Sequence, residues 1–203
     1  MARREGAYRD GRYDESRTLP DGSFVELRAY VHEVTRNVVA LDWDLARNEA
    51  MLQITELPSG ISYEAARDDF VATIAPWLDF RTFSAVDLHS SIRRLHELDE
   101  SGNSEVMSIA IDYQTQGGRH LTARGGGDTP LLGETETDEA LRRVRQVSTG
   151  RVGNFYWQPI DGSPLAERVH VYIIAEHGRF NITMPQPEQV IRYVAGRVRH
   201  YSR

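Results

Sequence analysis

Two short motifs place a histidine beside hydroxyl side chains: His89-Ser90-Ser91 and His120-Leu121-Thr122. Enzymes that cleave phosphodiesters can use two histidines, one as general base and one as general acid, with hydroxyl groups binding the phosphate oxygens. Serine and threonine are common in this chain, so such motifs also arise by chance. His89, Ser91, His120 and Thr122 are therefore the catalytic candidates of one hypothesis. Its alternative is two histidines on half-exposed strands.

A second pattern could hold a metal ion. Asp42 and Asp44 alternate with Trp43 on one predicted strand, and His32 lies on the strand before it. Two carboxylates and an imidazole can bind a divalent cation for hydrolysis. Strand alternation alone also explains these positions, because it places the two aspartates on the solvated face. We favour that simpler interpretation and expect no metal and no cofactor.

Three consecutive glycines, residues 125–127, resemble the start of a phosphate-binding loop. Such a loop needs its glycines directly before a helix, so that backbone N–H groups face the anion. Here the next predicted helix begins near Thr137, and acidic residues lie between. The pattern favours a mobile surface connection over a phosphate site.

Both ends of the chain are rich in arginine. Arginine interleaved with tyrosine, as in the N-terminal segment, is typical of nucleic-acid contacts and equally of protein interfaces. A solvated surface is the third interpretation, and all three stay open. The candidate binding residues are Arg3, Arg4, Arg9, Arg12, Arg192, Arg197 and Arg199.

Composition limits the classes of function. The chain has 203 residues, 40% of them hydrophobic, which suffices for a substantial core. It has no cysteine, and all 24 basic residues are arginine, which excludes thiolate and lysine chemistry. The net charge of −6 argues against binding of nucleic acid by the whole molecule. No apolar run is long enough for a membrane span, so we expect a cytoplasmic protein that does not enter membranes.

The elements that must position these candidates follow from hydrophobic periodicity. Residues 1–22 contain few aliphatic side chains and predict a flexible arm. Alternation predicts strands within 24–31, 38–45 and 50–57. A helix capped by Ser62 follows, with Ala66, Phe70, Ile74 and Trp77 on its apolar face and Pro76 near its end.

Two further blocks repeat this order. In the second, residues 105–113 and 119–124 predict a hairpin with Met107, Ile109, Ile111 and Tyr113 on one face. A helix from Thr137 follows, with Ala140, Val144 and Val147 inward and its arginines outward. The third block predicts strands within 153–160 and 167–184, then a helix from Pro187 with Val190, Val194, Val198 and Tyr201 on one face. Residues 86–99 fit a helix or a strand, and we favour the strand.

This order predicts an α+β fold: a mostly antiparallel sheet from about three strand-strand-helix units, with the helices on one face. We expect the flexible arm 1–22 and a single domain over 23–203, with possible sub-units 23–83, 84–148 and 149–203. The absence of a catalytic motif favours a non-enzymatic binding or assembly domain, an accessory or subunit of a larger complex. We expect a protein partner or a second copy of the chain. The alternatives are a phosphodiester- or nucleotide-directed hydrolase, and a nucleic-acid-binding protein that uses its basic termini.

Overall fold

The computed structural model of the chain describes residues 2–57, 60–127 and 129–203; the side chains of residues 1–8 and 31–37 lie outside this description. The chain divides into two compact units, Met1–Ser84 and Ala85–Arg203. We call them the N-terminal unit and the C-terminal unit and treat each by itself. The predicted division into an arm and one domain over 23–203 stays a prediction.

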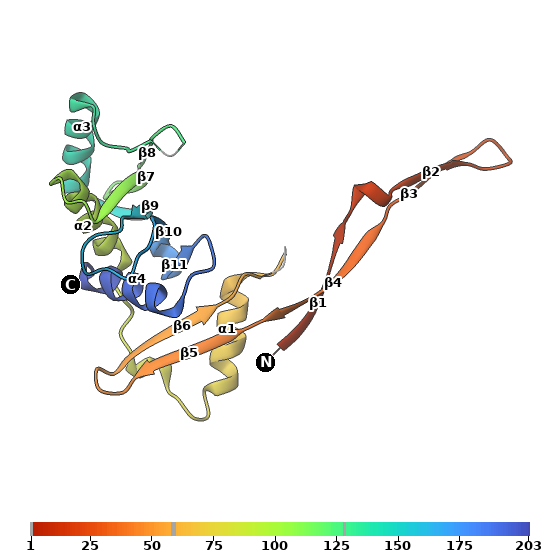
Figure 1. Cartoon of the computed structure of the whole chain (residues 1–203), viewed down its shortest axis with the longest axis horizontal. Helices are drawn as coiled ribbons and strands as arrows, with labels where there is room; N and C mark the ends of the chain where they lie inside the picture. Colours follow the sequence, from red (N-terminus) through yellow and green to blue (C-terminus); the bar gives the residue numbers. More distant parts are fainter. Residues whose placement is uncertain (1, 58–59, 128) are drawn as a thin grey trace. The chain divides into compact units, whose positions relative to one another are not determined.

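The N-terminal unit consists of two-stranded antiparallel sheets and one helix (Figure 1). β1 pairs with β4, β2 with β3, and β5 with β6. We call residues 2–37, which contain the first two sheets, the ribbon. The elements are β1 (Ala2–Arg9), η1 (Gly11–Tyr13), β2 (Glu15–Thr18), β3 (Phe24–Leu27), β4 (Tyr30–Asn37), β5 (Val39–Asp44), β6 (Glu49–Ile54), α1 (Tyr63–Ile74) and η2 (Phe80–Thr82).

Helix α1 begins where the sequence predicts. The Ser62 hydroxyl accepts hydrogen bonds from the backbone N–H groups of Glu64 and Ala65, which have no partner within the helix. The helix ends at Ile74, before Pro76. Trp77 therefore lies in the following turn and is 79% exposed, so its predicted place on the apolar face is wrong.

The C-terminal unit contains one five-stranded antiparallel sheet, in the order β11-β10-β9-β7-β8, and three helices. Its elements are α2 (Leu88–Glu100), β7 (Val106–Thr115), β8 (His120–Arg124), α3 (Thr135–Gln146), β9 (Ser148–Trp157), β10 (Val169–Ile174), η3 (Ala175–His177), β11 (Arg179–Ile182) and α4 (Glu188–His200).

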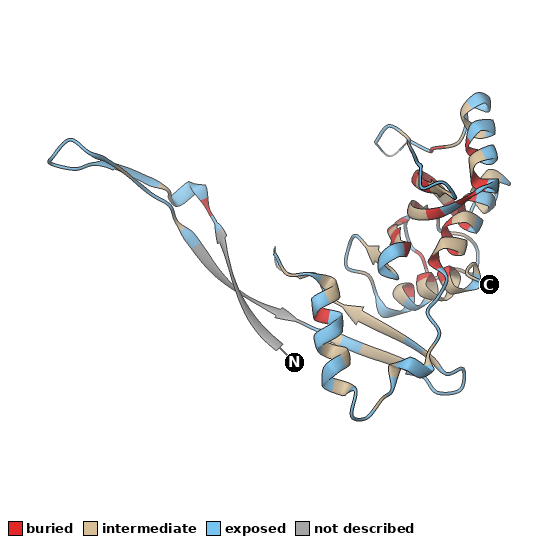
Figure 2. Ribbon diagram, turned by 180° about the vertical axis from the view of Figure 1, so that it is seen from behind, coloured by how far each residue is buried: buried red, intermediate tan, exposed pale blue. Residues whose placement is uncertain are grey.

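The core of this unit lies between the helices and one face of the sheet. Ile92, Leu95 and Val194 from the helices and Phe155 and Trp157 from β9 are fully buried. Along β9 and β10 buried residues alternate with half-buried ones, as expected when helices cover one face only. Figure 2 shows the buried residues concentrated in this unit.

Two register shifts between β7 and β9 change which residues face the core. The first skips Ile109, so that Val106 and Ser108 are buried before it and Ile109, Ile111 and Tyr113 after it. Met107 is only half-buried, which corrects its predicted place on the inward face. A bulge inserts one residue and inverts the alternation, which a strict period of two does not foresee.

Residues 88–100 form a helix, so the strand that we favoured for 86–99 is wrong. The Asp87 carboxylate caps the helix by accepting from the Ser90 N–H. Its buried residues, Leu88, Ser91, Ile92, Leu95 and His96, recur at helical spacing. The prediction failed because the buried face of this helix includes Ser91 and His96, and a pattern of apolar residues alone does not count polar ones.

The predicted face of α3 also needs correction. Ala140 is exposed and Val147 is 61% exposed, whereas Leu141 and Arg145 are buried. Arg145 turns inward because it forms ion pairs with Glu97 and Glu100 of α2. Burying an arginine costs less free energy when carboxylates pair with it than when its charge is left without a partner.

The fold class is confirmed: the protein is α+β with antiparallel sheets. The helix after Pro187 is also as predicted, with Val190, Val194 and Val198 buried along one side of α4.

Candidate functional site on the open face of the sheet

The face of the five-stranded sheet opposite the core is lined by polar residues at paired positions. One row runs Arg124–Ala110–Asn154–Tyr172 across β8, β7, β9 and β10. The next row contains Thr122, Asp112 and Val152. Because directly paired residues of neighbouring strands share a face, each row presents its side chains on the same side. We call this the open face.

The open face has a hollow of about 550 Å³. All four residues of the first row line it, with the small Ala110 within the row and the longer Arg124 and Tyr172 at its two ends. Gly125 and Gly127 of the loop after β8 also line it. The hollow has the size typical of sites for small molecules.

The glycine loop is held back against the sheet. The Gly125 N–H donates to the Ile109 carbonyl at 2.8 Å, and the Leu131 N–H donates to the Ser108 carbonyl at 2.7 Å. A Cβ at Gly125 would lie 2.1 Å from the Thr129 carbonyl oxygen, so only glycine fits there. The loop leads to α3 eight residues beyond Gly127. It is thus a connection between β8 and α3 that also forms part of the hollow's wall.

Beside the hollow, one carboxylate collects several donors. Asp112 Oδ1 accepts from the Thr122 hydroxyl at 3.2 Å, and Asp112 Oδ2 lies 3.5 Å from Arg151 Nη1. Arg151, which the second register shift leaves unpaired, also pairs with Glu176 and so holds the pKa of that carboxyl below its usual range. Asp112 thus has one charged neighbour, Arg151, and one neutral donor, Thr122.

His120 belongs to the same network. Its Nδ1 lies 2.6 Å from Arg151 Nη1 and 3.7 Å from Asp112 Oδ2. A guanidinium only donates hydrogen bonds, so the shorter contact requires Nδ1 to accept. The other ring nitrogen, Nε2, lies 3.2 Å from the same Arg151 Nη1.

Only one of the two predicted histidine motifs lies on the open face. His120 and Thr122 lie there, but His89 and Ser91 lie on α2, which packs against the covered face. The His89 Nδ1–H donates to the Gly150 carbonyl at 2.7 Å. Ser91 is fully buried, and its hydroxyl donates to the Val198 carbonyl at 2.9 Å. In this conformation Ser91 cannot reach a phosphate.

Sequence reasoning missed Arg124, Arg151, Asn154 and Tyr172. A usable signal was present, because Asn154 and Tyr172 alternate with the apolar residues that mark β9 and β10. Only the pairing of the strands shows that they share a row with Arg124.

The proposed metal ligands have other roles where they are described. Asp44 Oδ1 accepts from the N–H groups of Ala46 and Arg47 and so closes the β5–β6 turn. Asp42 is half-buried on β5, opposite Met51. The side chain of His32 lies outside the described residues. Among those that are described, no three histidine or acidic side chains are grouped to hold a metal ion.

Four of the candidate binding arginines are paired with acids: Arg9, Arg12, Arg192 and Arg197. Arg9 pairs with Asp14, and Arg12 with Asp10. The side chains of Arg3 and Arg4 lie outside the description. In α4, Arg192 pairs with Glu188. Arg199 lies in the last turn of α4 and is half-buried.

Arg197 has a structural role in the C-terminal unit. It forms an ion pair with Glu105, which is only 3% exposed and also accepts from the hydroxyls of Tyr193 and Tyr201. Burial raises the pKa of Glu105, but the hydrogen bonds and charge of Arg197 offset this and lower the pKa overall. Arg197 therefore anchors α4 and is not available to a partner.

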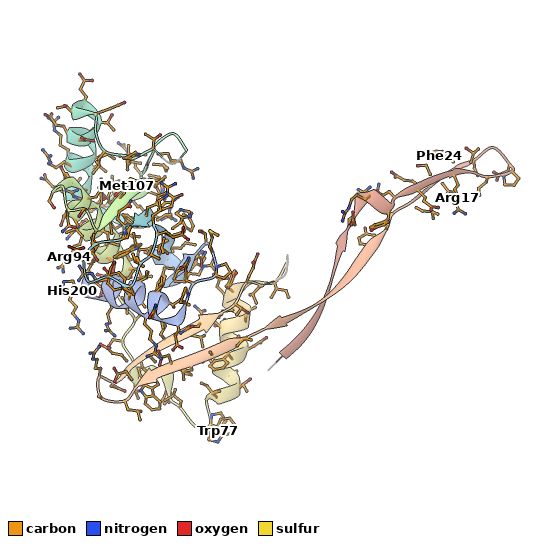
Figure 3. All side chains as sticks on the ribbon, viewed as in Figure 1. Arg17, Phe24, Trp77, Arg94, Met107 and His200 are labelled. Carbon is orange, nitrogen blue, oxygen red and sulfur yellow. The ribbon has the colours of Figure 1, made fainter. Side chains whose placement is uncertain are left out.

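The surface of the N-terminal unit differs from that of a folded domain. Among residues 9–30, 38–57 and 60–84, only Asp10 and Ala66 are buried. Large apolar side chains are exposed instead, as the labelled Phe24 and Trp77 show (Figure 3). They are Tyr13 (64%), Leu19 (42%), Phe24 (69%), Leu27 (47%), Tyr30 (59%), Val38 (39%), Trp43 (40%), Leu45 (74%) and Trp77 (79%).

Comparison of the chain with protein-family models, curated proteins and solved structures finds no match. Within the described residues, no helix combines the length and apolar character that a membrane crossing requires.

Proposed function

We propose that the protein is a non-enzymatic assembly subunit that docks through its N-terminal unit. The observation that carries this proposal is the lack of a buried core among the described residues of that unit, beside many exposed apolar side chains. Segments that expose this much apolar surface normally cover it on binding. A cytoplasmic location stays a prediction.

The occupant that we favour is a second copy of the chain. Each strand of the ribbon is paired on one side only within the described residues, which leaves its other edge able to add a strand. Residues 2–37 carry seven arginines and seven acidic residues, so two ribbons meet without net repulsion. The same balance gives little support to nucleic acid as the partner, because phosphate binding needs an excess of positive charge.

Light scattering after size-exclusion chromatography of the full chain tests the proposal over a range of concentrations. We expect a dimer or higher oligomer that dissociates on dilution. Serine substitutions at Phe24 and Tyr30 remove exposed aromatic surface and should weaken association by about tenfold or more, since each buried aromatic contributes roughly 1.5–3 kcal/mol.

Val147→Ser is the matched control, because Val147 is equally exposed but lies in the C-terminal unit. It should leave the oligomeric state unchanged. If the chain stays a monomer at all concentrations up to about 100 μM, a second copy is not the occupant. A dissociation constant above this value would mean a binding free energy weaker than about 5.5 kcal/mol. Association equally weakened by Val147→Ser would count against the N-terminal unit.

The hydrolase hypothesis remains a prediction with fewer residues behind it. Of its four catalytic candidates, only His120 and Thr122 lie on the open face.

A further inference from the structure

The strongest unassigned feature is the side chain of Arg124. It is exposed at one end of the hollow, and among the described residues it forms no ion pair and no side-chain hydrogen bond. The nearby Arg151 is engaged by Asp112 and Glu176. Arg124 thus lines the hollow with a guanidinium, whose planar set of N–H donors matches a carboxylate or phosphate.

The remaining lining complements the other end of such a ligand. Tyr172 lines the hollow at the far end of the row, and Asn154 lies between it and Ala110. Asp112 already accepts from Thr122 and lies near Arg151, but a carboxylate has about four acceptor positions, so it can also accept from a ligand hydroxyl. One part of the hollow therefore favours an anion and another favours hydroxyl donors.

We propose that the hollow binds a small hydroxylated organic anion, with its phosphate or carboxylate group on Arg124 and a hydroxyl on Asp112. This site is distinct from the N-terminal unit and does not depend on self-association. The acidic net charge of the whole chain does not oppose it, because the guanidinium acts at hydrogen-bond distance and distant exposed charges are screened.

Isothermal titration of the full chain with three related probes tests the site: ribose 5-phosphate, ribonate and ribose. The two anions should bind with dissociation constants of about 1 mM or tighter, and neutral ribose at least about tenfold more weakly, because charge-assisted hydrogen bonds are roughly twice as strong as neutral ones. The better of the two anions identifies the group that Arg124 prefers.

Arg124→Gln should reduce anion binding by about tenfold or more while leaving the weak binding of ribose unchanged. Arg119→Gln is the matched control, since it removes the same charge from the same hairpin outside the hollow. The Arg119→Gln variant should bind the two anions with the same affinity as the unaltered chain.

Two results would overturn the proposal. One is that neither anion binds better than ribose. The other is that Arg119→Gln weakens binding as much as Arg124→Gln, which would indicate a general charge effect. Both arginines are exposed, so thermal unfolding should show that the variants stay folded.

Discussion

The two units of this protein bury their side chains very differently. The C-terminal unit packs three helices against one face of a five-stranded sheet and encloses a continuous core. The described part of the N-terminal unit has six strands but buries almost nothing, because each of its sheets has only two strands. Isolated two-stranded sheets are at best marginally stable in water. Secondary structure alone therefore does not make a stable domain, and the exposed apolar side chains of the N-terminal unit are the reason why we propose a partner for it.

The largest expected effect compares one tryptophan from each unit. Trp157 is fully buried in the core, whereas Trp77 is 79% exposed. Trp157→Ala should lower the free energy of unfolding by about 3–5 kcal/mol, and Trp77→Ala by less than about 0.5 kcal/mol. Chemical denaturation followed by circular dichroism measures both. A large loss of unfolding free energy with Trp77→Ala would show that Trp77 has a packed environment within the N-terminal unit. The two units would then not differ in burial as described above.

The sequence predicted the C-terminal unit better in its strands than in its helices. Alternating apolar residues located β9, β10 and the β7–β8 hairpin, because one face of the sheet is buried and the other is not. It favoured a strand where α2 lies, and it predicted α3 as a helix but with the wrong inward face, because His96 and Arg145 occupy inward positions. These polar residues are stabilised by partners from other elements, which no local pattern contains.

The site was predicted even less completely than the fold. His120 and Thr122 were predicted on one strand and both lie on β8, but Arg124, Asn154 and Tyr172 come from three strands. Their convergence depends on strand order, and the β8-β7-β9-β10 order is not sequential.

The second prediction concerns the pH dependence of the core. His96 is fully buried, with its Nδ1 2.7 Å from the Tyr113 hydroxyl. Burial, assisted by the nearby Arg145 and opposed by Glu100, lowers the pKa of His96 to about 4. The unfolded chain takes up this proton near its ordinary pKa of 6.5, whereas the folded chain does so only near 4. The free energy of unfolding should therefore fall as the pH drops from about 6.5 to 4, by about 3 kcal/mol.

Denaturation of the unaltered chain and of His96→Gln at several pH values isolates this effect from the titration of carboxylates. The glutamine variant is less stable at pH 7 but should lack the additional loss between pH 6.5 and 4. Parallel curves for the two proteins would mean that His96 is protonated as readily in the folded state as in the unfolded chain.

The smallest effect tests whether α1 depends on its own sequence. The Ser62 hydroxyl caps two backbone N–H groups at the start of the helix. Ser62→Ala should reduce the helicity of the N-terminal unit and cost about 1 kcal/mol locally. Hydrogen exchange of the first-turn amides of α1 reports this local opening, while amides in α2 should be unaffected.

If self-association buries and holds this unit, dilution to the monomer should increase the exchange in α1 and leave α2 unchanged. Equal exchange at both concentrations would show that α1 is stabilised by its own cap and by β5 and β6, and not by a second copy.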